Sequence, residues 1–229
     1  MFELIPEKYY VQEIPKEITY SWCKNIHYSQ CIPANIQYCY GLFTYYDNSL
    51  IGVCVFGMGA NNNNNHINTI PILELQRLIL DSQYREKNIL SFFVAQCLRQ
   101  LPFTGFIISY ADETYNHYGY IYQATNFIYT GHTPNITYFK HKNDTKIIHR
   151  KTLYDKFNTS SQNVLQKFGY EPIITKPKHR YFYIKANNKK QRKEFLEILK
   201  TKYNILPYPK GTLSYYQEKS TAIKNKILF

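Results

Sequence analysis

The chain has 229 residues and a formal net charge of +12, from 28 Lys and Arg against 16 Asp and Glu. With 44% hydrophobic and 19% charged residues, its composition excludes wholesale disorder, and its length predicts one domain with at most a modest appendage. No apolar run reaches the roughly 20 residues of a membrane span, and residues 1–10 lack the apolar core of a signal peptide. Five cysteines without dense spacing favour reduced thiols. We therefore expect a cytoplasmic protein without a membrane partner.

The basic charge is concentrated in one part of the chain. Residues 1–130 contain 7 basic and 10 acidic residues, a net charge of −3, whereas residues 131–229 contain 21 and 6, a net charge of +15. An AT-rich genome would enrich lysine along the whole chain, so codon bias does not explain this asymmetry. We interpret residues 131–229 as a surface for a polyanion, most simply nucleic acid, with a solvated lysine-rich surface as the alternative.

The first half of the chain predicts a β-hairpin followed by a further strand. Residues 36–46 and 50–57 are β-branched and aromatic, and the turn residues Asp47-Asn48-Ser49 join them. Residues 59–68 are polar and low in complexity, which predicts a loop. Residues 72–80 predict a strand, although their pattern also allows a helix.

A buried helix and another strand follow. Residues 88–101 are mostly apolar at helical spacing and stop at Pro102, and residues 105–111 form a short apolar run. Strand, helix and strand within about 40 residues predict a βαβ crossover and a partly parallel sheet. The fold class is therefore α/β.

The second half is more irregular. Residues 115–130 predict a helix followed by a strand, and we expect a short helix that is capped by Ser160 or Ser161 and ends at Gly169. Residues 189–203 predict an amphipathic helix, and the chain after Lys210 predicts an extended arm. The remaining predicted strands are 136–141, 146–153 and 180–185.

The cysteines and histidines do not predict a metal site. Cys23, His27 and Cys31 are regularly spaced and Cys39 follows, but structural zinc uses two closely spaced pairs of ligands and no second pair exists. The remaining histidines form no H-E-x-x-H or deaminase pattern. We interpret His27 and Cys31 as packing and surface residues.

The segment Asp81–Asn88 is the candidate phosphate-binding loop. The chain has no P-loop or dinucleotide motif, but this segment lies between a predicted strand and a predicted helix. A helix N-terminus there presents backbone N–H groups, with Arg85 and Lys87 beside it, and could hold a phosphorylated donor. An ordinary charged loop is the alternative.

The segment from Ser109 to Asp112 ends the predicted parallel strand, where α/β sheets place their sites. A carboxylate at Asp112 can deprotonate or orient an amine, and the alternative is that it caps the segment beginning at Glu113. Arg77 lies in an apolar strand, so it either pairs with a carboxylate such as Glu74 or Asp112 or faces a cleft.

Aromatic and amide side chains interleave between Tyr115 and Tyr129. The polar side chains of this segment are His117, Gln123 and Asn126, and Tyr129 is one of its aromatic side chains. Such a set suits the stacking and edge recognition of nucleic-acid bases, and it equally suits a core with a polar rim.

These segments resemble the phage Mom-type DNA-modification proteins. The resemblance lies in Glu74-Leu-Gln-Arg77-Leu, in Ser109-Tyr-Ala-Asp112 and in the long irregular stretch from His117 to Gly131. Two later segments, Lys176–Tyr181 and Leu206–Lys210, resemble the same group, so that the likeness covers most of residues 72–210.

The resemblance implies a GNAT-like acyltransferase fold, with a mixed central sheet flanked by helices and a basic C-terminal extension. We expect one domain over residues 1–210, of which about 131–210 face nucleic acid, and a tail over 211–229. The implied partner is double-stranded DNA in a phage-infected bacterial cell. The implied activity adds a methylcarbamoyl-type group to adenine N6, which protects phage DNA from restriction.

The resemblance also implies roles for individual residues. Asp112 would accept a proton from N6, Tyr122 would act as an acid or orient the donor, and Arg77 would stabilise negative charge on the donor. Ser109 completes the candidate catalytic set. The donor would lie on the strand 73–80 and on the following loop, at Leu80, Asp81, Arg85, Lys87 and Asn88.

That loop has none of the glycines of the usual acetyltransferase pattern, so the donor is either acetyl-CoA or another small acyl compound. An iron requirement follows from the resemblance alone. The residues expected to contact DNA are His117, Gln123, Asn126, Tyr129, Lys140, Lys142, Arg150, Lys151, Lys178, His179 and Arg180. An acyltransferase acting on RNA or on a protein amine, and a non-catalytic nucleic-acid-binding module, are the alternatives.

Overall fold

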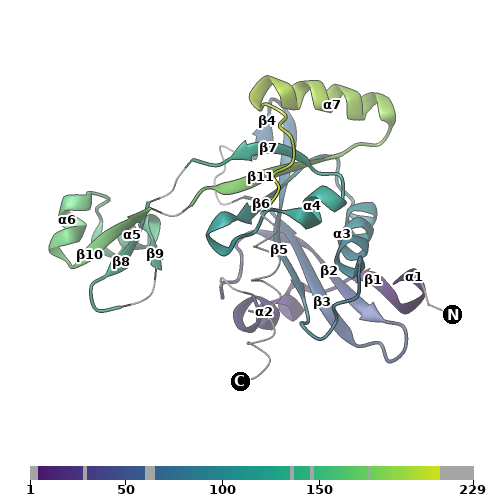
Figure 1. The fold of residues 1–229 in the computed structure, drawn as a ribbon, viewed down its shortest axis with the longest axis horizontal. Coiled ribbons are helices and arrows are strands. Elements are labelled where there is room, and N and C mark those ends of the chain that lie inside the picture. The colour runs from purple at the N-terminus through teal and green to yellow at the C-terminus, as the bar shows by residue number, and fades with distance from the viewer. Residues whose placement is uncertain are drawn as a thin grey trace. The chain divides into compact units, whose positions relative to one another are not determined.

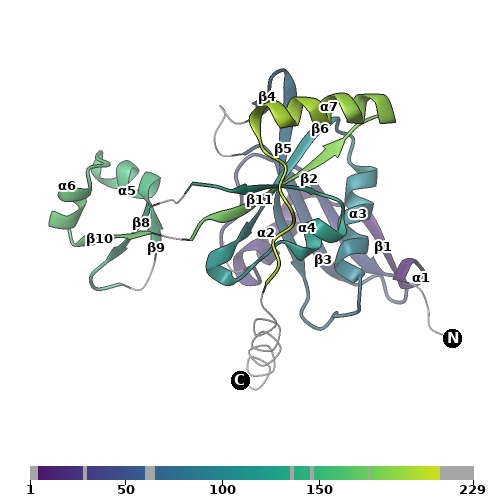
Figure 2. The same ribbon diagram turned by 45° about the horizontal axis from the view of Figure 1, so that its top comes forward.

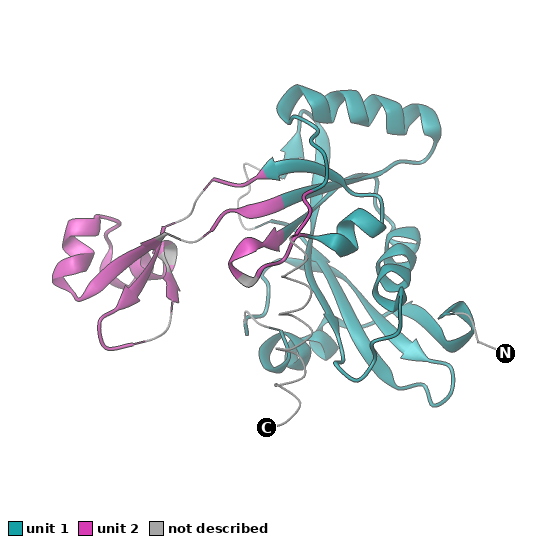
Figure 3. Ribbon diagram, in the orientation of Figure 1, with its two compact units in different colours: residues 1–110, 119–131, 180–208 teal, residues 111–118, 132–179, 209–229 magenta. Residues whose placement is uncertain are grey.

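The computed structural model divides into two compact units, which Figure 3 distinguishes by colour. Unit 1 comprises residues 1–110, 119–131 and 180–208, and unit 2 comprises residues 111–118, 132–179 and 209–229. The structure describes residues 5–27, 30–59, 65–134, 137–144, 147–174 and 176–211.

A mixed β-sheet forms the centre of the fold (Figure 1). Its described strands are β1 (Tyr9–Glu13), β2 (Ile36–Thr44), β3 (Leu50–Gly57), β4 (His66–Ile67), β5 (Ile70–Leu80), β6 (Gly105–Asp112), β7 (Ile128–His132) and β11 (Lys178–Lys185). The strand order is β1-β2-β3-β5-β6-β11-β7, with β4 paired to β5. The β1–β2, β2–β3 and β3–β5 pairs are antiparallel, and β5–β6 is parallel. The predicted mixed sheet and βαβ crossover are therefore confirmed.

Helices cover both faces of this sheet. Those of unit 1 are α1 (Ile5–Lys8), α2 (Lys16–Asn25), α3 (Ile89–Gln100), α4 (Tyr120–Ala124) and α7 (Lys189–Lys202). Cys23 of α2 packs in one apolar cluster with Val53 and Val55 of β3. Side chains alternate between the faces of a strand, and accordingly Cys54, between those two valines, contacts Cys97 of α3 instead.

The amphipathic helix α7 closes a second part of the core. Figures 1 and 2 both show it beside β4. Its buried Phe195 and Leu199, four residues apart, join the cluster that contains Phe106 of β6 and Phe182 of β11. The predicted helix over 189–203 is confirmed, and its burial explains why its apolar residues share one face.

A small lobe of unit 2 has its own core. It consists of β8 (Thr137–His141), β9 (Ile147–His149), α5 (Arg150–Phe157), α6 (Gln162–Lys167) and β10 (Tyr170–Ile174), with strand order β10-β8-β9. Phe139, Leu153, Leu165 and Tyr170 pack together in it. As predicted, Gly169 follows the short helix, with a φ of +82° that favours glycine. Ser161 occupies the N-cap position, but its side chain makes no capping hydrogen bond.

Three predictions of local structure are corrected or left open. The strand predicted over 146–153 is wrong beyond His149, because residues 150–157 form α5 and bury Leu153 against the lobe's sheet. Within the loop predicted over 59–68, residues 66–67 form β4, and residues 60–64 lie outside the described residues. The predicted tail lies outside them from residue 212 onward. Among the described helices, none is long and apolar enough to cross a membrane.

Candidate active site

The parallel strands β5 and β6 are paired over a short stretch. The paired residues are Ile72 with Phe106, Leu73 with Ile107 and Glu74 with Ile108. Immediately beyond them, the buried hydroxyl of Ser109 donates a hydrogen bond to the carbonyl oxygen of Leu75, at 3.0 Å. Ser109, predicted as a catalytic candidate, thus holds the strands together where their main-chain pairing ends.

Asp112 ends β6, and its carboxylate has two partners within unit 2. One oxygen accepts a hydrogen bond from the backbone N–H of Thr114 at 3.0 Å, and the other lies 3.1 Å from the ammonium nitrogen of Lys178. Asp112 is accordingly the N-cap of the short helix η2 (Glu113–Tyr115). The cap considered from the sequence is confirmed, and the proton-accepting role of Asp112 stays a prediction.

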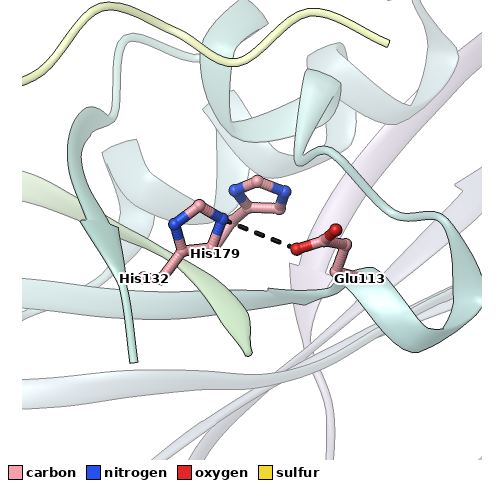
Figure 4. A group of neighbouring side chains, drawn as sticks. All are labelled: Glu113, His132 and His179. Carbon is pink, nitrogen blue, oxygen red and sulfur yellow. Dashed lines mark ion pairs between the residues drawn. The ribbon is translucent and has the colours of Figure 1, made fainter. Parts of the chain in front are cut away.

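A cluster that the sequence did not predict lies directly beside Asp112. Glu113, His132 and His179 each present a ligand-type atom, and these atoms all lie within 4.8 Å of one another. Figure 4 shows the three side chains converging, with His132 Nε2 3.6 Å from a carboxylate oxygen of Glu113. The two imidazole rings have centroids 4.4 Å apart. Residues far apart in sequence thus meet at one point of unit 2.

The backbone fixes the segments that carry this cluster. The N–H of Thr133 donates to the carbonyl oxygen of Lys178 at 2.8 Å, and the N–H of Lys178 donates to the Thr133 hydroxyl at 3.0 Å. This pair of bonds joins the residue after His132 to the residue before His179. The ion pair of Lys178 with Asp112 joins the same segment to the residue before Glu113.

His179 is 3% exposed, and Tyr118 lies against it with a ring-centroid distance of 5.5 Å. Burial lowers the pKa of His179, the neighbouring His132 lowers it further, and Glu113 acts in the opposite direction. The net effect favours the neutral imidazole, which has a lone pair available on one ring nitrogen.

Arg77, predicted to contact the donor, lies on β5 and is partly buried. Its terminal nitrogens donate to main-chain oxygens, one to Gln76 at 2.7 Å and one to Cys31 at 3.1 Å. Its buried Nε has no hydrogen-bond partner among the described residues. Main-chain carbonyl groups therefore hold the guanidinium in place, and its Nε–H is a further hydrogen-bond donor that they do not use.

The candidate phosphate loop, residues 81–88, has a defined conformation. Asp81 accepts hydrogen bonds from the N–H groups of Gln83 and Tyr84, and its own N–H donates to Ile51. Asn88 adopts a left-handed conformation with φ of +69° directly before α3. Asparagine tolerates this region better than most residues, so the chain turns into α3 without the expected glycine.

The loop is anchored to the N-terminal segment through Glu86. Tyr9 donates its hydroxyl hydrogen to Glu86 at 2.7 Å, and Lys8 pairs with the same carboxylate at 3.3 Å. Arg85 donates to the carbonyl oxygen of Ser82 at 2.7 Å, and Lys87 is exposed. Leu80 ends β5, opposite Gly52 of β3.

The aromatic residues between Tyr115 and Tyr129 include a packed core of unit 1. Tyr122 lies against Phe127 and Tyr181 with ring centroids 5.3 and 5.4 Å apart, and Tyr129 lies 5.1 Å from Tyr181. Gln123 donates to the hydroxyl of Tyr181 at 3.2 Å. The polar-rimmed core considered from the sequence is thus present, and His117 and Asn126 remain exposed.

The predicted DNA contacts fall into two groups. Lys142 and Arg150 are exposed on the lobe and Lys140 is half-buried there, whereas the side chain of Lys151 lies outside the described residues. Arg150 also donates to the carbonyl oxygen of Ser160 at 2.7 Å. The second group lies outside the lobe's core: Lys178 and His179 belong to the site above, and Arg180 donates to Thr130 and stacks on Tyr203.

The structure also describes the regularly spaced cysteines Cys23, Cys31 and Cys39. Cys23 and Cys39 are buried in the cluster beneath α2, and Cys31 is exposed. Within the described ranges, these residues do not form a group that could hold a metal ion.

Comparison with known proteins identifies the family of this chain. The methylcarbamoylase Mom of Escherichia phage Mu is 28% identical over 193 residues, which covers 80% of this chain and 76% of that protein. The family model of the Mom protein family matches residues 8–210. The family match therefore spans most of this chain. The chain belongs to the Mom protein family.

Solved structures of GNAT acetyltransferases are also similar. A GNAT family acetyltransferase from Bacillus cereus is 15% identical with a TM-score of 0.41, and the match covers 78% of this chain and 99% of that one. A GNAT family acetyltransferase from Elizabethkingia anophelis, solved with acetyl-CoA bound, is 10% identical with a TM-score of 0.43, covering 78% and 99%.

Proposed function

We propose that the protein transfers a small acyl-derived group, of methylcarbamoyl type, to N6 of adenine in double-stranded phage DNA and so protects that DNA from restriction. The observation that carries this proposal is the family match over residues 8–210, which includes the Asp112 region, the loop 81–88 and the basic lobe. The relative from phage Mu is named a methylcarbamoylase, which is the activity proposed here.

The reaction needs an activated donor in which a carbonyl carbon carries a leaving group. The bond between adenine N6 and the carbonyl carbon forms, and the bond from that carbon to the leaving group breaks. N6 loses one proton to a base, and the leaving group departs with the bonding electrons and takes up a proton. Because the N6 lone pair is delocalised into the ring, the base must leave the duplex stack and be held against the site.

Asp112, which ends β6, and Arg77, which lies on β5, are groups of suitable chemistry. Asp112 accepts the N6 proton, and its ion pair with Lys178 fixes the carboxylate in one position. The positive charge of the Arg77 guanidinium stabilises negative charge on the donor carbonyl. Tyr122 lies within the aromatic core, so it acts by holding neighbouring side chains in place.

The donor binds at the loop 81–88, where the chain turns from β5 into the N-terminus of α3. The anchored Glu86 and the left-handed Asn88 fix the loop, and Arg85 and Lys87 supply positive charge for a phosphorylated carrier such as that of acetyl-CoA. A methylcarbamoyl group contains a nitrogen that an acetyl thioester lacks, so the adduct's mass distinguishes these donors.

The basic region about 131–210 faces the DNA backbone. Residues 131–229 carry a net charge of +15, and Lys142 and Arg150 project from the lobe as exposed side chains. His117 and Asn126, both exposed, lie in the motif that predicts base recognition. We assign the phosphate contacts to the lobe and the base contacts to this motif.

Restriction of plasmid DNA tests the proposal. Plasmid from cells expressing the protein is digested with one enzyme whose site contains adenine and with one whose site contains only guanine and cytosine. We expect protection against the first enzyme alone, and loss of that protection in a folded Asp112→Asn protein. Cleavage at the empty-vector rate by both enzymes, with soluble wild-type protein present, contradicts DNA adenine as the acceptor.

A further inference from the structure

We propose that Glu113, His132 and His179 bind one divalent transition-metal ion and leave coordination positions open for water or substrate. Their ligand-type atoms lie within 4.8 Å of one another, and Figure 4 shows the three side chains directed toward a common point. The inference concerns binding by these residues and stands whether or not DNA is the acceptor.

The donor set is one that transition metals accept. Two imidazoles and one carboxylate suit the borderline divalent ions, whereas magnesium and calcium prefer oxygen ligands alone. Zinc and ferrous iron both bind such a set, so the iron requirement implied by family resemblance is chemically compatible with these residues. Three protein ligands are fewer than either ion takes in total, and the open positions are typical of catalytic sites.

The protein arranges these ligands in advance. The ligands lie on three chain segments, and each segment is joined to the next by a contact outside the ligand atoms. Thr133 and Lys178 exchange two hydrogen bonds between the segments of His132 and His179. The Asp112–Lys178 ion pair joins the segments of Glu113 and His179, and it balances the lysine charge next to the cation position.

Side-chain rotations bring the three ligand atoms, which all lie within 4.8 Å of one another, to the spacing of a metal site. Ligand atoms at adjacent positions around a metal, each bonded at about 2.1 Å, lie about 3 Å apart. The His132–Glu113 contact is 3.6 Å and these side chains are 44% and 27% exposed, so a rotation of either side chain can shorten this distance. Buried His179 serves as the fixed ligand.

Metal binding to the purified full-length protein tests the inference. Protein stripped with a chelator is incubated with Zn²⁺, Co²⁺ or, without oxygen, Fe²⁺, and then separated from free ion by gel filtration. Elemental analysis of the wild type is expected to give about one ion per chain with at least one of these metals. Bound Co²⁺ is expected to give the visible absorption of a site with few ligands.

Variants of the two more exposed ligands make the test specific. His132→Ala and Glu113→Gln are expected to weaken binding at least about tenfold while circular dichroism shows an unchanged fold. The matched control is His66→Ala, which removes an exposed histidine from β4 and is expected to bind like the wild type. Retention of wild-type binding by both ligand variants, or the absence of stoichiometric metal from the wild type, overturns the inference.

Discussion

The Ser109 hydroxyl lies 3.0 Å from the carbonyl oxygen of Leu75, at the point where the parallel pairing of β5 and β6 ends. The last paired residues are Glu74 and Ile108. The Ser109 side chain therefore links the two strands one residue beyond their last backbone pair. The hydroxyl is buried, so the bond is protected from water.

Replacement of Ser109 by alanine removes this bond and leaves the buried carbonyl of Leu75 without its side-chain donor. We expect the free energy of unfolding to fall by about 1–2 kcal/mol. Urea denaturation measures the change, with the exposed Ser82→Ala as the matched control. An unchanged midpoint would show that the hydroxyl contributes nothing to stability and would contradict the role described here.

Gly119 is expected to tolerate no side chain. Its φ is +71°, and a Cβ placed there would lie 2.4 Å from a ring carbon of Tyr181. Gly119→Ala combines backbone strain with a clash in the aromatic core, so we expect a loss of about 3 kcal/mol. Thermal denaturation provides the measurement. Gly59→Ala, whose nearest neighbours are flexible side-chain ends at 3.3 Å, is the control, and equal losses in the two variants would contradict the packing described.

The anchor between Tyr9 and Glu86 predicts a pH dependence of stability. The hydrogen bond from Tyr9 is the largest cause that lowers the pKa of Glu86 below its ordinary value of 4.5. A lowered carboxyl pKa stabilises the fold above pH 4.5, and this contribution disappears as the pH falls through the folded-state value. Tyr9→Phe is therefore expected to lose about 0.5 kcal/mol at neutral pH, because the carboxylate is partly exposed, and to differ less from the wild type in acid.

Melting temperatures across the range from pH 7 to acid test this prediction. Tyr46→Phe, which removes a hydroxyl from a side chain that is 98% exposed, is the control and should follow the wild type throughout. A Tyr9→Phe curve parallel to that of the wild type at every pH would show that Glu86 gains nothing from the hydrogen bond.

Arg180 is predicted to act as a structural residue that lysine cannot replace. Its Nε and Nη2 donate to the hydroxyl and carbonyl oxygens of Thr130 at 3.0 and 2.8 Å, and its guanidinium lies 4.2 Å from the ring centroid of Tyr203. Lysine keeps the positive charge, but it has no planar guanidinium to donate both hydrogen bonds to Thr130 and to stack on the Tyr203 ring. We expect Arg180→Lys to reduce stability by about 1–2 kcal/mol and to leave duplex DNA affinity nearly unchanged. Normal stability with weaker, less salt-dependent DNA binding would instead make Arg180 a phosphate contact.

Much of the central sheet could be predicted from local pattern. The β2–β3 hairpin and the β5–α3–β6 crossover are regular elements whose apolar residues follow strand or helix spacing, and Asp47-Asn48-Ser49 marks the turn between β2 and β3. Helix α5 was not predictable in this way, because only Leu153 and Phe157 mark its buried face and the β-branched residues before it favour a strand.

The site was predictable only in part, for a physical reason. Asp112 follows an apolar strand, which is a local signal of a candidate site. Glu113, His132 and His179 carry no such signal, because they meet only through the pairing of strands remote in sequence. In the sequence, the spacing of Glu113, His132 and His179 matches no metal-binding motif. The folded chain brings these three residues, and Lys178 beside them, together.

Mass spectrometry of nucleosides tests the central claim most directly. DNA and RNA are purified from cells expressing the wild-type protein or the Asp112→Asn variant, hydrolysed, and compared with material from empty-vector cells. The account predicts a new deoxyadenosine derivative in the wild-type DNA alone, with a mass that identifies the transferred group. Unmodified deoxyadenosine beside soluble wild-type protein, or an adduct found only in the RNA, would contradict it.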